Sequence, residues 1–130
     1  MAGKPGIGKS TLVLQILSLV SKNNDVKLAY FSAEESSTQI QERFMRLFPN
    51  QELVCDIFHS NDIEDIVATA ANYDLIIIDS IQTISSNTVD GIAGSPSQVK
   101  QCSEQLIETC KKNNIAAIII GHVTKGGEIA

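Results

Sequence analysis

The sequence has little of the material that several classes of protein require. Among its 130 residues it contains no tryptophan, and aromatic residues make up only 5%. Fifteen acidic residues outnumber ten basic ones, which gives a formal net charge of −5. A domain that grips nucleic acid by itself usually concentrates lysine and arginine on one surface. The composition therefore excludes a basic DNA-binding module, although local loops or assembly into a larger complex would still allow contact with DNA.

The sequence also gives no sign of disulfide bonds, zinc ligands or membrane-spanning segments. Cys55, Cys102 and Cys110 contain no C-x-x-C pair, so their spacing predicts neither a disulfide framework nor a zinc site. We expect Cys102 and Cys110 to be small core residues of one helix in a reducing compartment. No apolar run approaches membrane-spanning length, and no secretory leader opens the chain. These absences indicate a soluble, cytoplasmic protein without a membrane partner.

The hydrophobic pattern predicts a single α/β domain. Hydrophobic residues make up 43% of the chain, which is enough for one core at this length. Helical and strand periods alternate, which is typical of a three-layer fold with a mainly parallel sheet. The expected strands are 27–32, 53–59, 74–80 and 115–122, and the expected helices are 9–22, 37–48, about 61–72 and 96 to about 113.

Several residues are expected at particular places in these elements. The expected inward-facing residues are Val13, Ile16, Leu17 and Val20 in the first helix, Ile40, Phe44 and Leu47 in the second, and Val99, Cys102, Leu106 and Cys110 in the last. Asn61 with Glu64, and Ser95 with Gln98, have the spacing of a capping box, in which the later side chain bonds back to the first residue. Residues 85–95 are polar and rich in glycine, and predict a loop long enough to suggest a function.

The chain begins Met-Ala and continues with Gly-Lys-Pro-Gly-Ile-Gly-Lys-Ser, the spacing of a phosphate-binding loop. Such a loop is rich in glycine because its backbone N–H groups must converge on a phosphate. Lys9 would reach the β- and γ-phosphates of ATP, and the Ser10 hydroxyl would bind Mg²⁺. The following helix would direct its positive end at the same anion. The expected ATP-binding residues are Gly3, Pro5, Gly6, Gly8, Lys9, Ser10 and Thr11; an ordinary Gly-Pro turn before a helix is the alternative.

Carboxylates follow two of the expected strands. Asp79 ends a run of four bulky apolar residues, where it would hold Mg²⁺ at the edge of the sheet or, alternatively, cap a turn. Ser80 follows it, so the Asp-Glu pair of many helicases is absent and the group that activates water must lie elsewhere. Glu34 and Glu35 are the candidates for that group. A solvated acid pair near a helix N-terminus is the alternative for both.

Polar residues also follow the last expected strand. His122 and Thr124 lie where a side chain can sense the γ-phosphate, although a histidine at a strand end can be purely structural. Lys125 precedes two glycines, which predicts a mobile basic loop. No guanine-specific Asn-Lys-x-Asp motif occurs, and the basic residues do not cluster as in the lid of a small-molecule kinase. A GTPase and a metabolite kinase are therefore disfavoured.

Five runs of the sequence carry a resemblance to one known family: GKPGIGKSTL, SAEES, YDLIIIDSIQT, GSPSQVKQC and GHVTKGGEIA. They are similar to the ATPase core of the bacterial RadA (Sms) family, DNA-repair proteins among the RecA-like motors. The resemblance implies a RecA-like P-loop NTPase fold across residues 1–130. It also implies Lys9 and Ser10 as Walker A residues, Asp79 as the Walker B acid, and Glu34 rather than Glu35 as the catalytic glutamate. His122 would occupy the sensor position.

The same resemblance implies partners. Members of the family form hexameric rings that act on branched or single-stranded DNA. Here the loop at residues 85–95 and the one after Lys125 would line the central channel of a ring. The alternative is a nucleotide-gated assembly or regulatory ATPase that does not move DNA.

The sequence departs from that family at both ends. The four-cysteine zinc module, the Lon-protease-like domain and the strand that leads into the phosphate-binding loop are missing. We therefore expect a partial ATPase core, truncated at both ends, with little or no ATPase activity in isolation. Unpaired backbone groups beside the missing strand would cost about 1 kcal/mol or more each where buried.

Overall fold

Four parallel strands form one sheet in the computed structural model, which describes residues 7–22 and 25–121. The strands are β1 (Leu28–Ser32), β2 (Asp56–His59), β3 (Leu75–Asp79) and β4 (Ala116–Ile120). They lie in the order β2-β1-β3-β4, and each neighbouring pair is parallel. Parallel neighbours require long crossover connections, which helices supply here. The expected α/β fold with a parallel sheet is confirmed.

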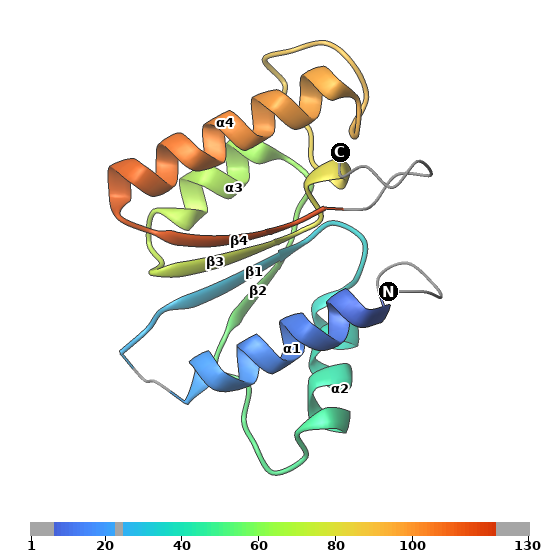
Figure 1. Ribbon diagram of the computed structural model, residues 1–130, viewed down its shortest axis with the longest axis vertical. Helices are drawn as coiled ribbons and strands as arrows, with labels where there is room; N and C mark the ends of the chain where they lie inside the picture. The colour runs from blue at the N-terminus through green and yellow to red at the C-terminus, as the bar shows by residue number, and fades with distance from the viewer. Residues whose placement is uncertain (1–6, 23–24, 122–130) are drawn as a thin grey trace.

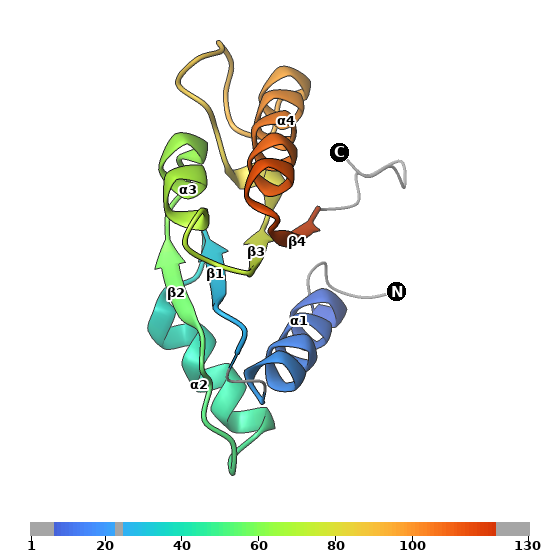
Figure 2. The same ribbon diagram turned by 90° about the vertical axis from the view of Figure 1, so that its left-hand side faces the viewer.

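Helices cover both faces of the sheet (Figures 1 and 2). α1 (Ile7–Ser21) and α2 (Ser37–Leu47) lie on one face, and α3 (Ile63–Ala70) and α4 (Pro96–Asn113) lie on the other. A short 3-10 helix, η1 (Ile81–Thr83), follows β3. None of the helices in the described residues has both the length and the apolar character needed to cross a membrane.

Two hydrophobic clusters fill the spaces between the sheet and its helices. The cluster under α1 and α2 contains Val13, Leu14, Leu17, Leu28, Tyr30, Ile40, Phe44, Ile77 and Ile120. The cluster under α3 and α4 includes Ala29, Phe31, Ile63, Ile66, Ile76, Ile78, Cys102 and Leu106. Successive residues of β1 and β3 thus alternate between two buried faces. Burial on both faces explains why these strands are continuous apolar runs.

The inward faces of the helices differ in detail from the expected ones. In α1, Leu14 is buried beside Val13 and Leu17, whereas Ile16 is only half-buried. In α2, the prediction for Leu47 is wrong because this residue is 46% exposed. Phe48 packs against Phe44 instead, with ring centroids 5.1 Å apart. Positions four apart lie on one helix face, and the larger aromatic ring occupies the space.

Both expected capping boxes are wrong, because the distal side chains bond elsewhere. α3 begins after Asp62, whose carboxylate accepts a hydrogen bond from the Glu64 backbone N–H at 2.9 Å. Ser95 does cap α4, accepting from the Gln98 N–H at 3.4 Å. The side chains of Glu64 and Gln98 instead reach the loop that follows η1. Backbone groups of that loop need partners, and these two side chains supply them.

The open edges of the sheet are those of β2 and β4. Within the described residues, neither strand has a partner on its outer side. On β4, Ala116, Ala117 and Ile119 are exposed. A strand added to this sheet would pair with one of these two edges.

Candidate active site at the carboxyl end of the sheet

Two acidic segments meet where β1 and β3 end. Ser32, the last residue of β1, lies opposite Asp79, the last residue of β3. The Ala33 N–H lies 3.4 Å from the Asp79 carbonyl oxygen, which extends the strand pairing by one residue. The turn that carries Glu34 and Glu35 therefore begins directly beside Asp79. The structure brings together the two segments that the sequence predicts to carry the reaction.

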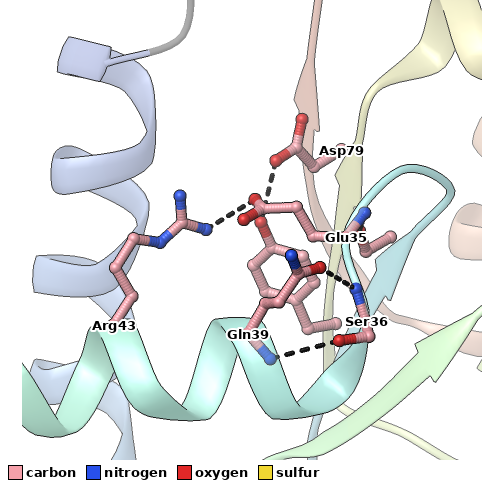
Figure 3. A network of polar contacts seen from close by, with 7 residues as sticks. Glu35, Ser36, Gln39, Arg43 and Asp79 are labelled. Carbon is pink, nitrogen blue, oxygen red and sulfur yellow. Dashed lines mark hydrogen bonds and ion pairs between the residues drawn. The ribbon is translucent and has the colours of Figure 1, made fainter.

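The two adjacent glutamates have different surroundings. Glu35 forms an ion pair with Arg43 of α2, with 2.6 Å between the Oε1 and Nη2 atoms (Figure 3). Its backbone N–H donates to the Ser32 hydroxyl at 3.0 Å. Glu34 is exposed, and no described residue forms a hydrogen bond or ion pair with its side chain. Glu34 is therefore the glutamate whose carboxylate is free to bind another group.

The turn between β1 and α2 is anchored at both ends. Ser36 and Gln39 form a reciprocal capping box at the start of α2 (Figure 3). On the other side, His59 Nε2 lies 3.0 Å from the Ala33 carbonyl oxygen. These bonds fix the backbone on either side of the glutamates. No motif in the sequence indicates that His59 belongs to this region.

Tyr30 is a second residue of this region that no sequence motif indicates. It lies in the middle of β1, is 2% exposed, and donates a hydrogen bond from its hydroxyl to Asp79 Oδ2 at 2.8 Å. Burial raises the pKa of Tyr30 well above its usual range, and the charge of Asp79 adds to the effect. The phenol therefore stays protonated and remains a donor. The one signal in the sequence for this contact is a tyrosine within an apolar strand. The hydroxyl of a buried tyrosine usually has a hydrogen-bond partner.

The Asp79 carboxylate lies at the carboxyl end of β3 and is half-buried. One of its carboxylate oxygens accepts from Tyr30, and no described residue bonds to the other. No group of three or more His, Cys, Asp or Glu side chains in the described residues could hold a metal by itself. Mg²⁺ commonly uses one or two carboxylates and takes its other ligands from phosphate and water. The residues present fit a metal that arrives with a nucleotide.

The remaining predicted residues lie in or beyond α1. Figure 1 shows α1 starting at the end of the sheet where the strands finish. Gly8, Lys9 and Ser10 fall in the first turn of α1, but their side chains lie outside the described part, and Thr11 is exposed. Gly3, Pro5, Gly6, His122, Thr124 and Lys125 lie outside the described residues.

A buried glutamine holds the loop that follows η1. Gln98 is 1% exposed, and its Oε1 accepts from the Ser86 backbone N–H at 2.7 Å. Its Nε2 lies 3.0 Å from the carbonyl oxygen of Val89 and 3.1 Å from that of Gly91. One side chain of α4 thus organises six residues of backbone, from Ser86 to Gly91.

Glu64 of α3 holds the same loop from the other side. Its carboxylate accepts from the Ser86 hydroxyl at 2.7 Å, the Asn87 N–H at 2.9 Å and the Gln105 amide at 2.8 Å. Burial acts to raise the pKa of Glu64, but the bonds from Asn87, Ser86 and Gln105 together lower it below its ordinary value. The loop is therefore attached to both helices that cover this face.

The tip of this loop is apolar and acidic. Gly91 and Gly94 have φ angles of +110° and +89°, and residues other than glycine rarely adopt such backbone conformations. Ile92 between them is 81% exposed. The segment 85–95 contains Asp90 and no lysine or arginine. In Figure 1 it leaves the sheet at the end that carries Asp79.

Comparison with known proteins identifies the family of this chain. The sequence model of the family described as "AAA domain" matches residues 1–128. The chain belongs to the AAA domain family. It is 43% identical over 132 residues to DNA repair protein RadA of Aquifex aeolicus (strain VF5), covering 100% of this chain and 29% of that protein.

Two further relatives carry the same name. DNA repair protein RadA of Campylobacter jejuni subsp. jejuni serotype O:2 is 41% identical over 133 residues, and that of Streptococcus pneumoniae (strain ATCC BAA-255 / R6) is 41% identical over 132 residues. Each match covers 100% of this AAA domain but only 29% and 31% of the relative. The resemblance to RadA expected from the motifs is confirmed, and the chain spans less than a third of these proteins.

Proposed function

We propose that this domain binds and hydrolyses ATP as the core of a DNA-repair motor. The observation that carries the proposal is the meeting of Asp79 with the turn that presents Glu34, at the end of the sheet where α1 begins. Ligands of open parallel sheets bind at this edge. The phosphate-binding pattern before α1 supplies the complementary half of the site.

Each residue has a separate role in the proposed reaction. The backbone of residues 3–8 and Lys9 bind the phosphates of ATP, while Ser10 and Asp79 hold Mg²⁺. The metal supplies positive charge that stabilises the phosphoryl group during transfer. Glu34 orients the attacking water and accepts its proton. His122 reports the γ-phosphate to the loops that follow.

The contrast between the two glutamates supports Glu34 as the base. Glu35 is neutralised by Arg43 at 2.6 Å, whereas the Glu34 carboxylate has no described partner. The guanidinium of Arg43 occupies the Glu35 carboxylate, so that carboxylate is less available to contact a water molecule. The carboxylate of Glu34 is therefore the one that can contact the attacking water.

Contact with DNA is proposed through loops and assembly. The relatives are named DNA repair proteins, but this domain has a net charge of −5 and its 85–95 loop has no basic residue. One copy therefore offers little attraction for phosphate. A homo-oligomeric ring, with a hexamer as the expected form, would bring several 85–95 loops together around single-stranded or branched DNA. It would also bring together several copies of Lys125 and of the loop that follows it.

Substitutions in a full-length protein that contains this domain test the catalytic assignment. We expect Lys9→Ala to abolish turnover and Glu34→Gln to lower kcat by roughly a hundredfold or more while ATP still binds, since general-base catalysis contributes about 10²- to 10⁴-fold. Glu35→Gln is the matched control, because it changes the neighbouring carboxylate in the same way. Normal hydrolysis by Glu34→Gln would show that the base is a different residue.

A second function is favoured by the acidic character of the 85–95 loop. In that case ATP would control assembly or regulation without movement along DNA. Measuring ATPase rates with and without single-stranded DNA separates the two functions. Stimulation by DNA supports the motor, and an unchanged rate with nucleotide-dependent oligomerisation supports the regulatory ATPase.

A further inference from the structure

We propose that Tyr30 is a positioning residue that orients the Asp79 carboxylate for metal binding. This inference rests on the proposed function, because it assigns Asp79 to the metal. The observation behind it is the 2.8 Å hydrogen bond from the Tyr30 hydroxyl to Asp79 Oδ2.

The register of the sheet explains how Tyr30 reaches Asp79. Tyr30 lies opposite Ile77, two residues before the pair of Ser32 and Asp79. Side chains two apart along a strand point to the same face, roughly 6.6 Å from each other along the chain. The phenol on β1 therefore extends along the sheet toward its carboxyl end and meets the last side chain of β3.

The ring of Tyr30 is packed closely enough to fix the position of its hydroxyl. It belongs to the cluster formed with Leu14 of α1 and with Ile40 and Phe44 of α2, all of which are buried. Close packing on these sides restricts its rotamers. The hydroxyl is thus presented at one point, and the carboxylate that accepts from it is fixed by the same contact.

The bond leaves half of the carboxylate available. Oδ2 accepts from Tyr30, while Oδ1 has no described partner. Groups that hydrogen-bond to a metal ligand fix its orientation and are commonly worth about 10- to 100-fold in metal affinity or activity. Tyr30 would therefore keep Oδ1 directed outward, so that Asp79 need not be ordered when the metal and nucleotide arrive.

The ion pair beside it limits competition for the metal. Figure 3 shows Glu35 and Arg43 on the same side of the sheet as Asp79. Because Arg43 already neutralises Glu35 at 2.6 Å, Glu35 has less attraction for a cation than a free carboxylate. The cation is therefore expected to bind the oriented carboxylate of Asp79 and not the neutralised carboxylate of Glu35.

Packing alone does not account for a tyrosine at this position. Phenylalanine would fill the same buried space without a hydroxyl that must be removed from water. The one described partner of that hydroxyl is Asp79. The hydroxyl therefore acts on the carboxylate, and its removal should affect the metal more than the fold.

A matched control exists at the opposite end of the sheet. Tyr73 also donates from its hydroxyl to a carboxylate, that of Asp56 at the start of β2. Tyr73→Phe thus removes the same kind of bond away from the carboxyl ends of the strands. Comparing it with Tyr30→Phe separates an effect on the metal site from a general effect of losing a phenol.

The test uses the full-length protein and measures metal binding as well as turnover. Mn²⁺ binding in the presence of a non-hydrolysable ATP analogue is followed by electron paramagnetic resonance, and the Mg²⁺ concentration for half-maximal ATPase rate is measured in parallel. We expect Tyr30→Phe to raise the Kd for Mn²⁺ and the Mg²⁺ concentration for half-maximal rate by roughly tenfold each. We expect it to leave metal-free binding of the analogue unchanged, and Tyr73→Phe to leave all three unchanged.

A double-mutant cycle assigns the effect to Asp79. In an Asp79→Asn background, Tyr30→Phe should weaken Mn²⁺ binding no further, since the group that it orients is already altered. Wild-type metal binding by Tyr30→Phe, an equal shift in Tyr73→Phe, or full additivity in the cycle would each overturn the inference. Normal metal binding and turnover in Asp79→Asn alone would instead refute the proposed function.

Discussion

Replacing Gln98 with leucine should release the loop at residues 85–95 from α4. Leucine has a similar size and helix propensity, so α4 itself should persist. The Ser86 N–H loses its 2.7 Å acceptor, and Ser86 is buried with 4% exposure. A buried donor left without a partner costs about 1–3 kcal/mol. The carbonyls of Val89 and Gly91 are less buried and can bond to water, so they add little.

A loss of about 2 kcal/mol raises the equilibrium constant for local opening of the loop by roughly 30-fold, since 1.4 kcal/mol is a factor of ten. Hydrogen exchange of peptides that span 85–95, measured in the full-length protein by mass spectrometry, reports this opening directly. Gln101→Leu is the control, because Gln101 lies about one turn further along α4 and its side chain forms no hydrogen bond with a described residue. Unchanged exchange in Gln98→Leu, or equal acceleration in both variants, would refute the role of Gln98.

Two further predictions concern ionisable groups. The folded pKa of Glu64 lies below its ordinary value of 4.5, so ionised Glu64 stabilises the folded loop above that pH and the contribution is lost as pH falls through the folded pKa. Exchange in the loop, corrected for its intrinsic pH dependence, should therefore rise below about pH 4.5 in the wild type, whereas Glu64→Gln should show no such rise. Burial raises the pKa of Cys55 to about 12 and that of Cys102 to about 11. Iodoacetamide at pH 8 should thus label the native protein at least about tenfold more slowly than the denatured one, because the thiolate is the reactive form; equal rates would contradict it.

The sheet and the order of its elements could be predicted from the sequence because their signals are local. β3 is a run of four apolar residues before an acid, and burial on both faces makes such a run stand out. Asp79 and the Glu34–Glu35 pair were placed at strand ends for the same reason. Their proximity followed from the rule that parallel strands end at one edge of a sheet.

The missed features depend on contacts between distant segments. Tyr30 acts on Asp79 only because β1 and β3 pair in one particular register, which no local pattern reveals. Glu64 and Gln98 have the spacing of caps, but the loop 85–95 offers them buried backbone partners that a helix start does not. In each case a tertiary contact determined where the side chain points.

The pairing of β1 with β3 also determines when a nascent chain forms the candidate active-site edge. Residues 28–36 leave the ribosome before the strand that completes their surroundings, which follows at residues 75–79. Until then Tyr30 has no carboxylate to bond and the turn at Ala33 lacks the carbonyl of its neighbour. During translation, the edge that carries Asp79 and Glu34 therefore forms only after α2, β2 and α3 have been made.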